Sequence, residues 1–168
     1  MKTVKVKVYE YAELNDEAKE KARQWLLEGG MDYQWAWEGI NNDSESVGLK
    51  ITEMDPQGQG RSDGRFIGSA IETALKIVKE HGKTCETYKT AKAYLEAVKA
   101  LGEEPEDGWS VSEEARLEDL EDEFLRGILS DYRINARKEM EYVESEEYMA
   151  ETMEANGYTF TKDGKRFG

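Results

Sequence analysis

The 168-residue chain has very few residues of the types that build disulfides and zinc sites. Its single cysteine, Cys85, excludes an intrachain disulfide and is typical of proteins in a reducing compartment. Its single histidine, His81, is too few for a zinc site, which usually takes several spaced Cys or His ligands. No segment approaches the run of about eighteen apolar residues that crosses a bilayer. We therefore expect no disulfide, no metal site and no membrane span.

The composition also argues against a secretion signal and against disorder. The N-terminal segment MKTVKVKVYEY has lysines but no continuous apolar stretch, so it does not read as a signal peptide. Aromatic residues make up 10% of the chain, with four Trp and nine Tyr, whereas disordered chains lack such anchors. We expect a folded protein that stays in the cytoplasm where it is made.

Negative charge is abundant and unevenly distributed. The chain has 37 Asp and Glu against 23 Lys and Arg, a net charge of −14. Residues 1–100 hold 15 basic and 17 acidic residues, whereas residues 101–168 hold 8 and 20. A surface of this sign repels DNA and RNA and attracts basic surfaces. The charge predicts no direct nucleic-acid binding and favours a basic protein partner.

Hydrophobic periodicity predicts a mostly helical α+β fold in one domain, with a small antiparallel sheet. Residues 1–102 form its near-neutral α+β part, and residues 103–168 form its acidic helical part with a terminal β-hairpin. Two short strands are expected at 3–11 and 48–55. Helices are expected at 13–30, around Tyr33–Ile40 before a polar break at 41–46, at 70–82, at 84–102, from Ser112 to about Val143, and from Ser145 onward.

Capping and turn residues set the expected ends of these elements. Asn15, Ser112 and Ser145 are predicted N-caps, because their side chains can accept a hydrogen bond from the first helical turn. The tail YTFTKDGKRFG is predicted to be a hairpin with an Asp-Gly loop. That loop would pair Lys162 with Lys165 and Phe160 with Phe167, which places both Phe side chains on one face.

The helix expected from Ser112 combines an apolar stripe with many carboxylates. From Glu103 to Glu123 there are eleven acidic residues and one basic residue, Arg116. Such a face is ordinary for a soluble protein, but a rigid row of carboxylates can also imitate a nucleic-acid backbone. The predicted partner-binding residues are the carboxylates Glu113, Glu114, Glu118, Asp119, Glu121, Asp122, Glu123, Glu139, Glu144 and Glu147, with Trp109 and Tyr142 as apolar anchors.

A glycine-rich segment, GQGRSDGRFIG, is the alternative site. Its residues Gly58, Gly60, Arg61, Asp63 and Arg65 could present backbone amides and guanidinium groups to an anion. The spacing matches neither GxGxxG nor GxxxxGK[ST], so a turned connection is the simpler interpretation. A small enzyme, such as a nuclease or a nucleotide-processing protein, would use this segment with His81. Otherwise His81 serves as a cation near a helix C-terminus, and we expect no catalytic residues and no cofactor.

Both ends of the chain resemble a family of uncharacterised tailed-phage proteins. The resemblance rests on YAELNDEAKEKARQW (11–25), on DPQGQGRSDGRF, and on ESEEYMAETMEANGYTFTKDGKRF (144–167). The middle departs from the family pattern, with EMDPQG and the helix-like AIETALKIVKEHG in place of its aromatic stretch and following strand. The resemblance implies a phage gene product that acts in the host cell cytoplasm, and it transfers no catalytic residues.

The acidic helical tail is also weakly similar to acidic anti-CRISPR inhibitors. Together, the charge and the resemblance predict an inhibitor of a host nucleic-acid-handling defence complex, of the anti-CRISPR or anti-restriction kind. Its partner would be a protein with a basic nucleic-acid-binding cleft. An antitoxin-like or regulatory phage protein remains a further alternative, and the sequence leaves the target and the oligomeric state open.

Overall fold

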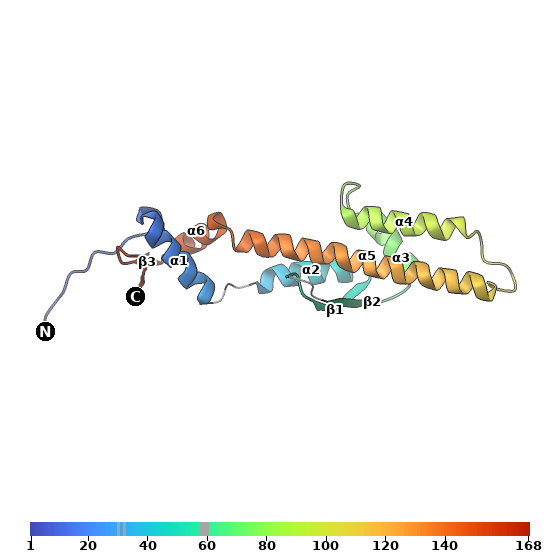
Figure 1. The fold of residues 1–168 in the computed structure, drawn as a ribbon, viewed down its shortest axis with the longest axis horizontal. Coiled ribbons are helices and arrows are strands. Elements are labelled where there is room, and N and C mark those ends of the chain that lie inside the picture. The colour runs from blue at the N-terminus through green and yellow to red at the C-terminus, as the bar shows by residue number, and fades with distance from the viewer. Residues whose placement is uncertain (30, 32, 58–60) are drawn as a thin grey trace. The chain divides into compact units, whose positions relative to one another are not determined.

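The computed structural model describes the chain except for residues 30, 32 and 58–60. It is a mainly helical α+β structure with short antiparallel strand pairs (Figure 1), as the sequence predicts. Its elements are the 3₁₀ helix η1 (Tyr11–Glu13), α1 (Asp16–Glu28), α2 (Gln34–Ser46), β1 (Leu49–Met54), β2 (Ser62–Phe66), α3 (Ala70–Glu80), α4 (Glu86–Ala100), α5 (Val111–Val143), α6 (Glu146–Ala155), β3 (Thr159–Phe160) and β4 (Arg166–Phe167).

The chain forms two compact units. Unit 1 consists of Met1–Gln34 and Glu139–Gly168, and unit 2 consists of Trp35–Lys138. These boundaries differ from the charge boundary at residue 102, because α5 contributes to both units. The expectation of a single domain stays a prediction.

Unit 2 is built around the apolar stripe of α5. Leu120, Phe124, Ile128 and Tyr132 recur every four residues and are all buried, as the periodicity predicts. The Phe124 ring stacks between Tyr94 of α4 and Phe66 of β2, with ring centroids 4.6 and 5.3 Å away. This stack ties α5 to one helix and to the strand pair, and Figure 1 shows α4 running alongside α5.

The β1–β2 pair requires a glycine at its centre. Gly64 lies opposite Ile51, and a Cβ atom there would come within 2.7 Å of the Lys50 carbonyl oxygen and 3.0 Å of Leu129. Any side chain would therefore push β2 away from β1 or from α5. The turned connection that the sequence predicts for this segment is wrong for residues 62–66, which form a strand.

Unit 1 has its own smaller core. Phe160 is fully buried and packs with Ala18, Ala22, Met149 and Met153. The Trp25 ring meets Phe160 and Tyr158 edge to face, at centroid distances of 6.0 and 5.3 Å. The predicted caps hold here, since Asn15 accepts from the Ala18 amide and Ser145 from the Tyr148 amide.

The predicted strand at 3–11 is wrong for most of its length. Only Tyr9 pairs, through an antiparallel bridge to Phe160, and Tyr11 already begins a 3₁₀ helix. Val4 and Val6 are exposed, because no described strand lies beside them to accept and donate ladder hydrogen bonds. Alternation of apolar and polar residues does not by itself make a strand when no neighbouring strand pairs with it.

Two helix boundaries also differ from expectation. The polar run 41–46 does not break α2, because Ser44 faces the interior and its hydroxyl donates to the Asn41 carbonyl at 3.0 Å. The helix ends instead beside Gly48, whose φ of +92° only glycine adopts readily. The N-cap of α5 is Ser110, not Ser112: Ser110 and Glu113 exchange side-chain and backbone hydrogen bonds.

The terminal hairpin forms, but in a register one residue away from the predicted one. Phe160 pairs with Arg166, and Thr159 pairs with Phe167. The Thr161 amide donates to the Lys165 carbonyl and Gly164 has φ +85°, so three residues form the loop rather than two. The shift buries Phe160 while leaving Phe167 exposed, so the two side chains do not share a face.

Candidate partner-binding surface

The first candidate surface is the exposed side of α5 near its N-terminus, which we call the acidic face. Its carboxylates are solvent-exposed and recur at i, i+4 spacing along the helix, which places neighbours about 5–6 Å apart. Its residues are Glu114, Glu118, Asp119, Asp122 and Glu123. The apolar stripe on the opposite side of α5 packs into unit 2, so the helix that carries the acidic face is held in place by buried contacts.

The acidic face is not neutralised within the described part of the chain. There, no carboxylate between Glu103 and Glu123 makes an ion pair. Arg126 directs its Nε at the Asp122 carbonyl oxygen, 3.4 Å away, rather than at a carboxylate. The negative charge is therefore directed at solvent.

The predicted residues Glu113 and Glu121 differ from the exposed five. Glu113 accepts hydrogen bonds from the backbone and hydroxyl of Ser110, which lower the pKa of its carboxyl. Glu121 is half-buried, and burial raises its pKa, with further contributions from the charges of Asp122 and Glu118. Glu113 therefore serves the helix cap, while the raised pKa of Glu121 comes first from burial and second from its charged neighbours.

The raised pKa of Glu121 predicts a pH dependence of stability. A carboxyl whose pKa is higher in the folded than in the unfolded state binds more protons when folded, so stability falls as pH rises from its ordinary value of 4.5 through the raised value. We expect Glu121→Gln to remove this loss and to increase the free energy of unfolding at pH 7 but not at pH 4. Urea unfolding across this pH range measures it, and an identical pH profile for both proteins would contradict it.

The remaining predicted residues of the acidic tail lie in unit 1. Glu139 and Glu147 are exposed. Glu144 instead accepts a hydrogen bond from the Tyr33 hydroxyl at 2.7 Å. Burial and this carboxylate raise the pKa of Tyr33 to about 12. Glu144 is therefore committed to a contact inside unit 1. Within unit 2, the structure assembles the five carboxylates of the acidic face on one side of α5.

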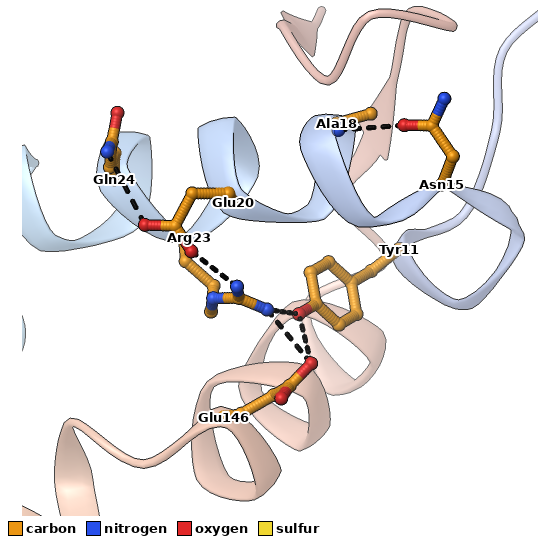
Figure 2. A network of polar contacts seen from close by, with 7 residues as sticks. All are labelled: Tyr11, Asn15, Ala18, Glu20, Arg23, Gln24 and Glu146. Atoms are coloured by element: carbon orange, nitrogen blue, oxygen red, sulfur yellow. Dashed lines mark hydrogen bonds and ion pairs between the residues drawn. The ribbon is translucent and has the colours of Figure 1, made fainter.

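A second carboxylate of the tail, Glu146, belongs to a polar network that the sequence did not reveal (Figure 2). The Arg23 guanidinium donates to the Tyr11 hydroxyl at 2.8 Å and to Glu146 at 2.9 Å, and it also binds Glu20. The network links η1, α1 and α6 across 135 residues of sequence. Its partners are too far apart in the chain for periodicity to find them.

The two predicted aromatic anchors differ in exposure. Trp109 is half-buried in the loop before α5. Tyr142 is exposed, and its ring lies 5.2 Å from the Tyr148 ring in a tilted arrangement. Tyr142 therefore offers accessible aromatic surface in unit 1, as expected of an anchor, whereas Trp109 offers less.

The structure describes three of the five residues of the alternative, glycine-rich site. Gly58 and Gly60 lie outside the described residues. Arg61 pairs with Asp63 at 3.5 Å, and Arg65 lies in β2 opposite Lys50. Of the two arginines, Arg65 thus lies within β2, and Arg61 directly precedes it and is paired with its neighbour Asp63.

Unit 2 also contains an acid–histidine–hydroxyl cluster, in which Thr87 is buried and Asp43 is exposed. A ring nitrogen of His81 lies 2.6 Å from the Thr87 hydroxyl, and the other lies 3.5 Å from the Asp43 carboxylate. Asp43 also accepts from the Tyr132 hydroxyl at 2.6 Å. Thr87 is only 4% exposed, so its hydroxyl is closed to a substrate. The cluster joins the ends of α2, α3 and α4 to α5, and His81 caps the C-terminus of α3 as expected.

Comparisons with protein-family models, curated proteins and solved structures found no match to this chain. Within the described ranges, no group of three or more His, Cys, Asp or Glu side chains is placed to hold a metal ion. Nor does any described helix combine the length and the apolarity needed to cross a membrane.

Proposed function

We propose that this protein binds, through the acidic face of α5, a basic surface on a protein that handles nucleic acids. The observation that supports the proposal is the unpaired charge of that face: exposed carboxylates at helical spacing, without an ion pair among the described residues. Like charges at this spacing cost a few tenths of a kcal/mol per pair. Solubility alone does not require these repelling charges to be concentrated on one face, whereas binding to a basic surface does.

The charge spacing favours a nucleic-acid-binding cleft as the target. The five carboxylates of the acidic face lie between Glu114 and Glu123, which at about 1.5 Å per residue is roughly one charge per 3 Å of helix axis. Each strand of double-stranded DNA carries about one charge per 3.4 Å. A cleft that receives the phosphates of such a strand would therefore meet a similar linear charge density on α5.

The biological setting comes from the resemblance to tailed-phage proteins. A phage product of this kind would act in the host cell as an inhibitor of a defence complex, of the anti-CRISPR or anti-restriction kind, by occupying the cleft in place of nucleic acid. Such an inhibitor needs no catalytic group. The burial of the Thr87 hydroxyl, and the placement of Arg65 within β2 and of Arg61 just before it, fit this non-enzymatic role.

Capture from a bacterial lysate tests the proposal. We expect the wild-type protein to retain a nucleic-acid-binding protein at about 50 mM salt and to release it at about 500 mM, because salt screens exposed charges. A variant with Glu114, Glu118, Asp119, Asp122 and Glu123 changed to Gln or Asn should retain at least tenfold less of that protein. Equal capture by both proteins would contradict the proposal.

A matched control separates local charge from net charge. Changing the exposed residues Glu17, Glu28, Glu53, Glu80 and Glu96 to Gln alters the net charge by the same five units and leaves the acidic face intact. We expect this control to capture the partner within about twofold of wild type. Capture of a toxin rather than a nucleic-acid-handling complex would favour the antitoxin-like alternative.

A further inference from the structure

Helix α3 presents a partly exposed apolar stripe in unit 2. Its buried side consists of Ala70, Thr73, Ala74 and Ile77. A second stripe on the same helix contains Ile71 and Leu75, which are 39% and 55% exposed, with the half-buried Val78 one turn further on. The exposed Ile67 precedes the helix. Clusters of exposed large apolar side chains mark interaction sites more often than isolated ones do.

The spacing of this stripe is that of a helix-pairing seam. Ile71, Leu75 and Val78 lie at i, i+4 and i+7, the pattern by which one helix packs along another. On a helical wheel Glu72 and Lys79 both lie on the same flank of the stripe, seven residues apart with Leu75 between them. Both are exposed.

These charges make the surface complementary to itself. When two identical helices pack antiparallel about a two-fold axis, residues on the same flank face one another, and a contact of i with j recurs as j with i. With the axis beside Leu75, Glu72 of one copy faces Lys79 of the second copy, and this pair occurs twice. Among the described residues Lys79 makes no ion pair, so its ammonium group is available.

The surrounding charge also favours this face for contact between two acidic molecules. Residues 70–83 contain Lys76, Lys79 and Lys83 against Glu72 and Glu80, so this segment is slightly basic in a chain of net charge −14. Two copies that approach through α3 therefore keep like charge out of the contact itself, and salt screens the charge on the rest of each molecule.

We propose that the α3 stripe is a self-association surface, and that two copies of the chain pair through antiparallel α3 helices with Leu75 at the centre and Glu72–Lys79 ion pairs at the flanks. The patch is much smaller than a standard interface of about 20–30 residues a side, so the dimer is weak. It forms as the protein is concentrated from about 10 μM to about 1 mM. This surface is separate from the acidic face, and either one can operate without the other.

Sedimentation equilibrium over that concentration range tests the proposal. We expect the average mass of the wild type to rise from 19.2 kDa toward twice that value. Leu75→Glu should remain monomeric throughout, and its unchanged helical circular dichroism would show that it is folded, since Leu75 is exposed. A wild type that stays monomeric at 1 mM, or a Leu75→Glu variant that dimerises like wild type, overturns the proposal.

Charge reversal at Lys79 provides the specific test of the antiparallel geometry, since Glu72 must be kept for the capping box of α3. Lys79→Glu places Glu72 opposite a second carboxylate and should weaken dimerisation at least tenfold, while Lys79→Arg keeps the charge and should dimerise within about twofold of wild type. Lys76→Glu is the matched control, because it changes the charge equally but lies further around the helix from the stripe. Equal weakening by Lys79→Glu and Lys76→Glu, or by Lys79→Glu and Lys79→Arg, overturns the pairing.

Salt distinguishes this contact from partner binding by the acidic face. Higher salt should strengthen the dimer, since it screens repulsion between two chains of net charge −14 while the contact is mainly apolar. Binding through the acidic face should instead weaken with salt. A dimer that dissociates at high salt overturns the apolar seam as its basis.

Discussion

Replacing Gly164 with alanine should destabilise unit 1 more than any other single methyl group added to the terminal hairpin. A Cβ at this position would lie 2.1 Å from the Ala18 carbonyl oxygen and 2.8 Å from its Cα, so the loop would have to leave α1. Gly164 also has φ +85°, a conformation that costs a side-chain-bearing residue about 1–2 kcal/mol. The two effects together should lower the free energy of unfolding by about 3 kcal/mol or more.

Gly157→Ala is the matched control for this prediction. Gly157 also has a positive φ, +63°, but a Cβ there meets no atom within 4 Å. Gly157→Ala should therefore lower the free energy of unfolding only by the conformational cost of about 1 kcal/mol. Urea unfolding followed by Trp fluorescence compares the two variants, because Trp25 packs in the unit 1 core. Equal losses for Gly157→Ala and Gly164→Ala would contradict the close approach between the hairpin and α1.

Phe124→Ala should cost unit 2 about 3–5 kcal/mol, the range for a buried aromatic side chain. Phe124 is 3% exposed, and its ring lies between Tyr94 and Phe66 in the stack that ties α5 to α4 and β2. Removing the ring leaves a cavity and deprives both neighbours of their stacking partner. Because whole domains are stable by only 5–15 kcal/mol, unit 2 should then be partly unfolded at 37 °C.

Phe124→Leu and Phe167→Ala are the controls for this loss of stability, and both should lose less than Phe124→Ala. Leucine keeps most of the buried volume, so Phe124→Leu should cost about 1–2 kcal/mol. Phe167 is 40% exposed in the hairpin, so Phe167→Ala should cost less than about 1 kcal/mol. Thermal unfolding followed by circular dichroism ranks the three variants. A loss below 1.5 kcal/mol for Phe124→Ala would show that the ring stack does not organise the unit 2 core.

The long helices could be predicted because their information is local. The stripe from Leu120 to Tyr132 repeats at helical spacing, and each residue of it is buried. The Ser145 cap lies next to the helix that it begins. The true cap of α5 was also readable: Ser110 has Glu113 three residues later, the capping-box spacing, whereas Ser112 has Ala115.

The missed features depend on partners that are distant in sequence. Whether residues 3–8 form a strand depends on a neighbour that alternation cannot reveal. The Asp43–His81–Thr87–Tyr132 cluster draws its members from four helices, and Arg23 finds Glu146 only after folding. The hairpin register follows from the Thr161 and Gly164 backbone, not from the Asp-Gly pair alone.

The same distinction applies to the candidate surface. The five exposed carboxylates were predictable because the buried stripe of α5 fixes which residues point outward. The sequence did not predict that Glu144 accepts a hydrogen bond from Tyr33 or that Glu121 is half-buried, because both depend on tertiary packing. The acidic face therefore retains all five of its exposed carboxylates, and Glu139 and Glu147 are exposed as well, whereas Glu144 is engaged.

The most direct test of the acidic face is a competition experiment with the nucleic-acid-binding protein that the lysate capture yields. Its complex with a fluorescent nucleic acid is titrated with the wild type, the five-residue acidic-face variant and the equal-charge control, and anisotropy reports release of the nucleic acid. We predict release by the wild type and the control, with an affinity that falls as salt rises, and at least tenfold weaker release by the acidic-face variant. Equal release by all three proteins, or binding of the wild type that leaves the nucleic acid in place, would contradict mimicry by α5.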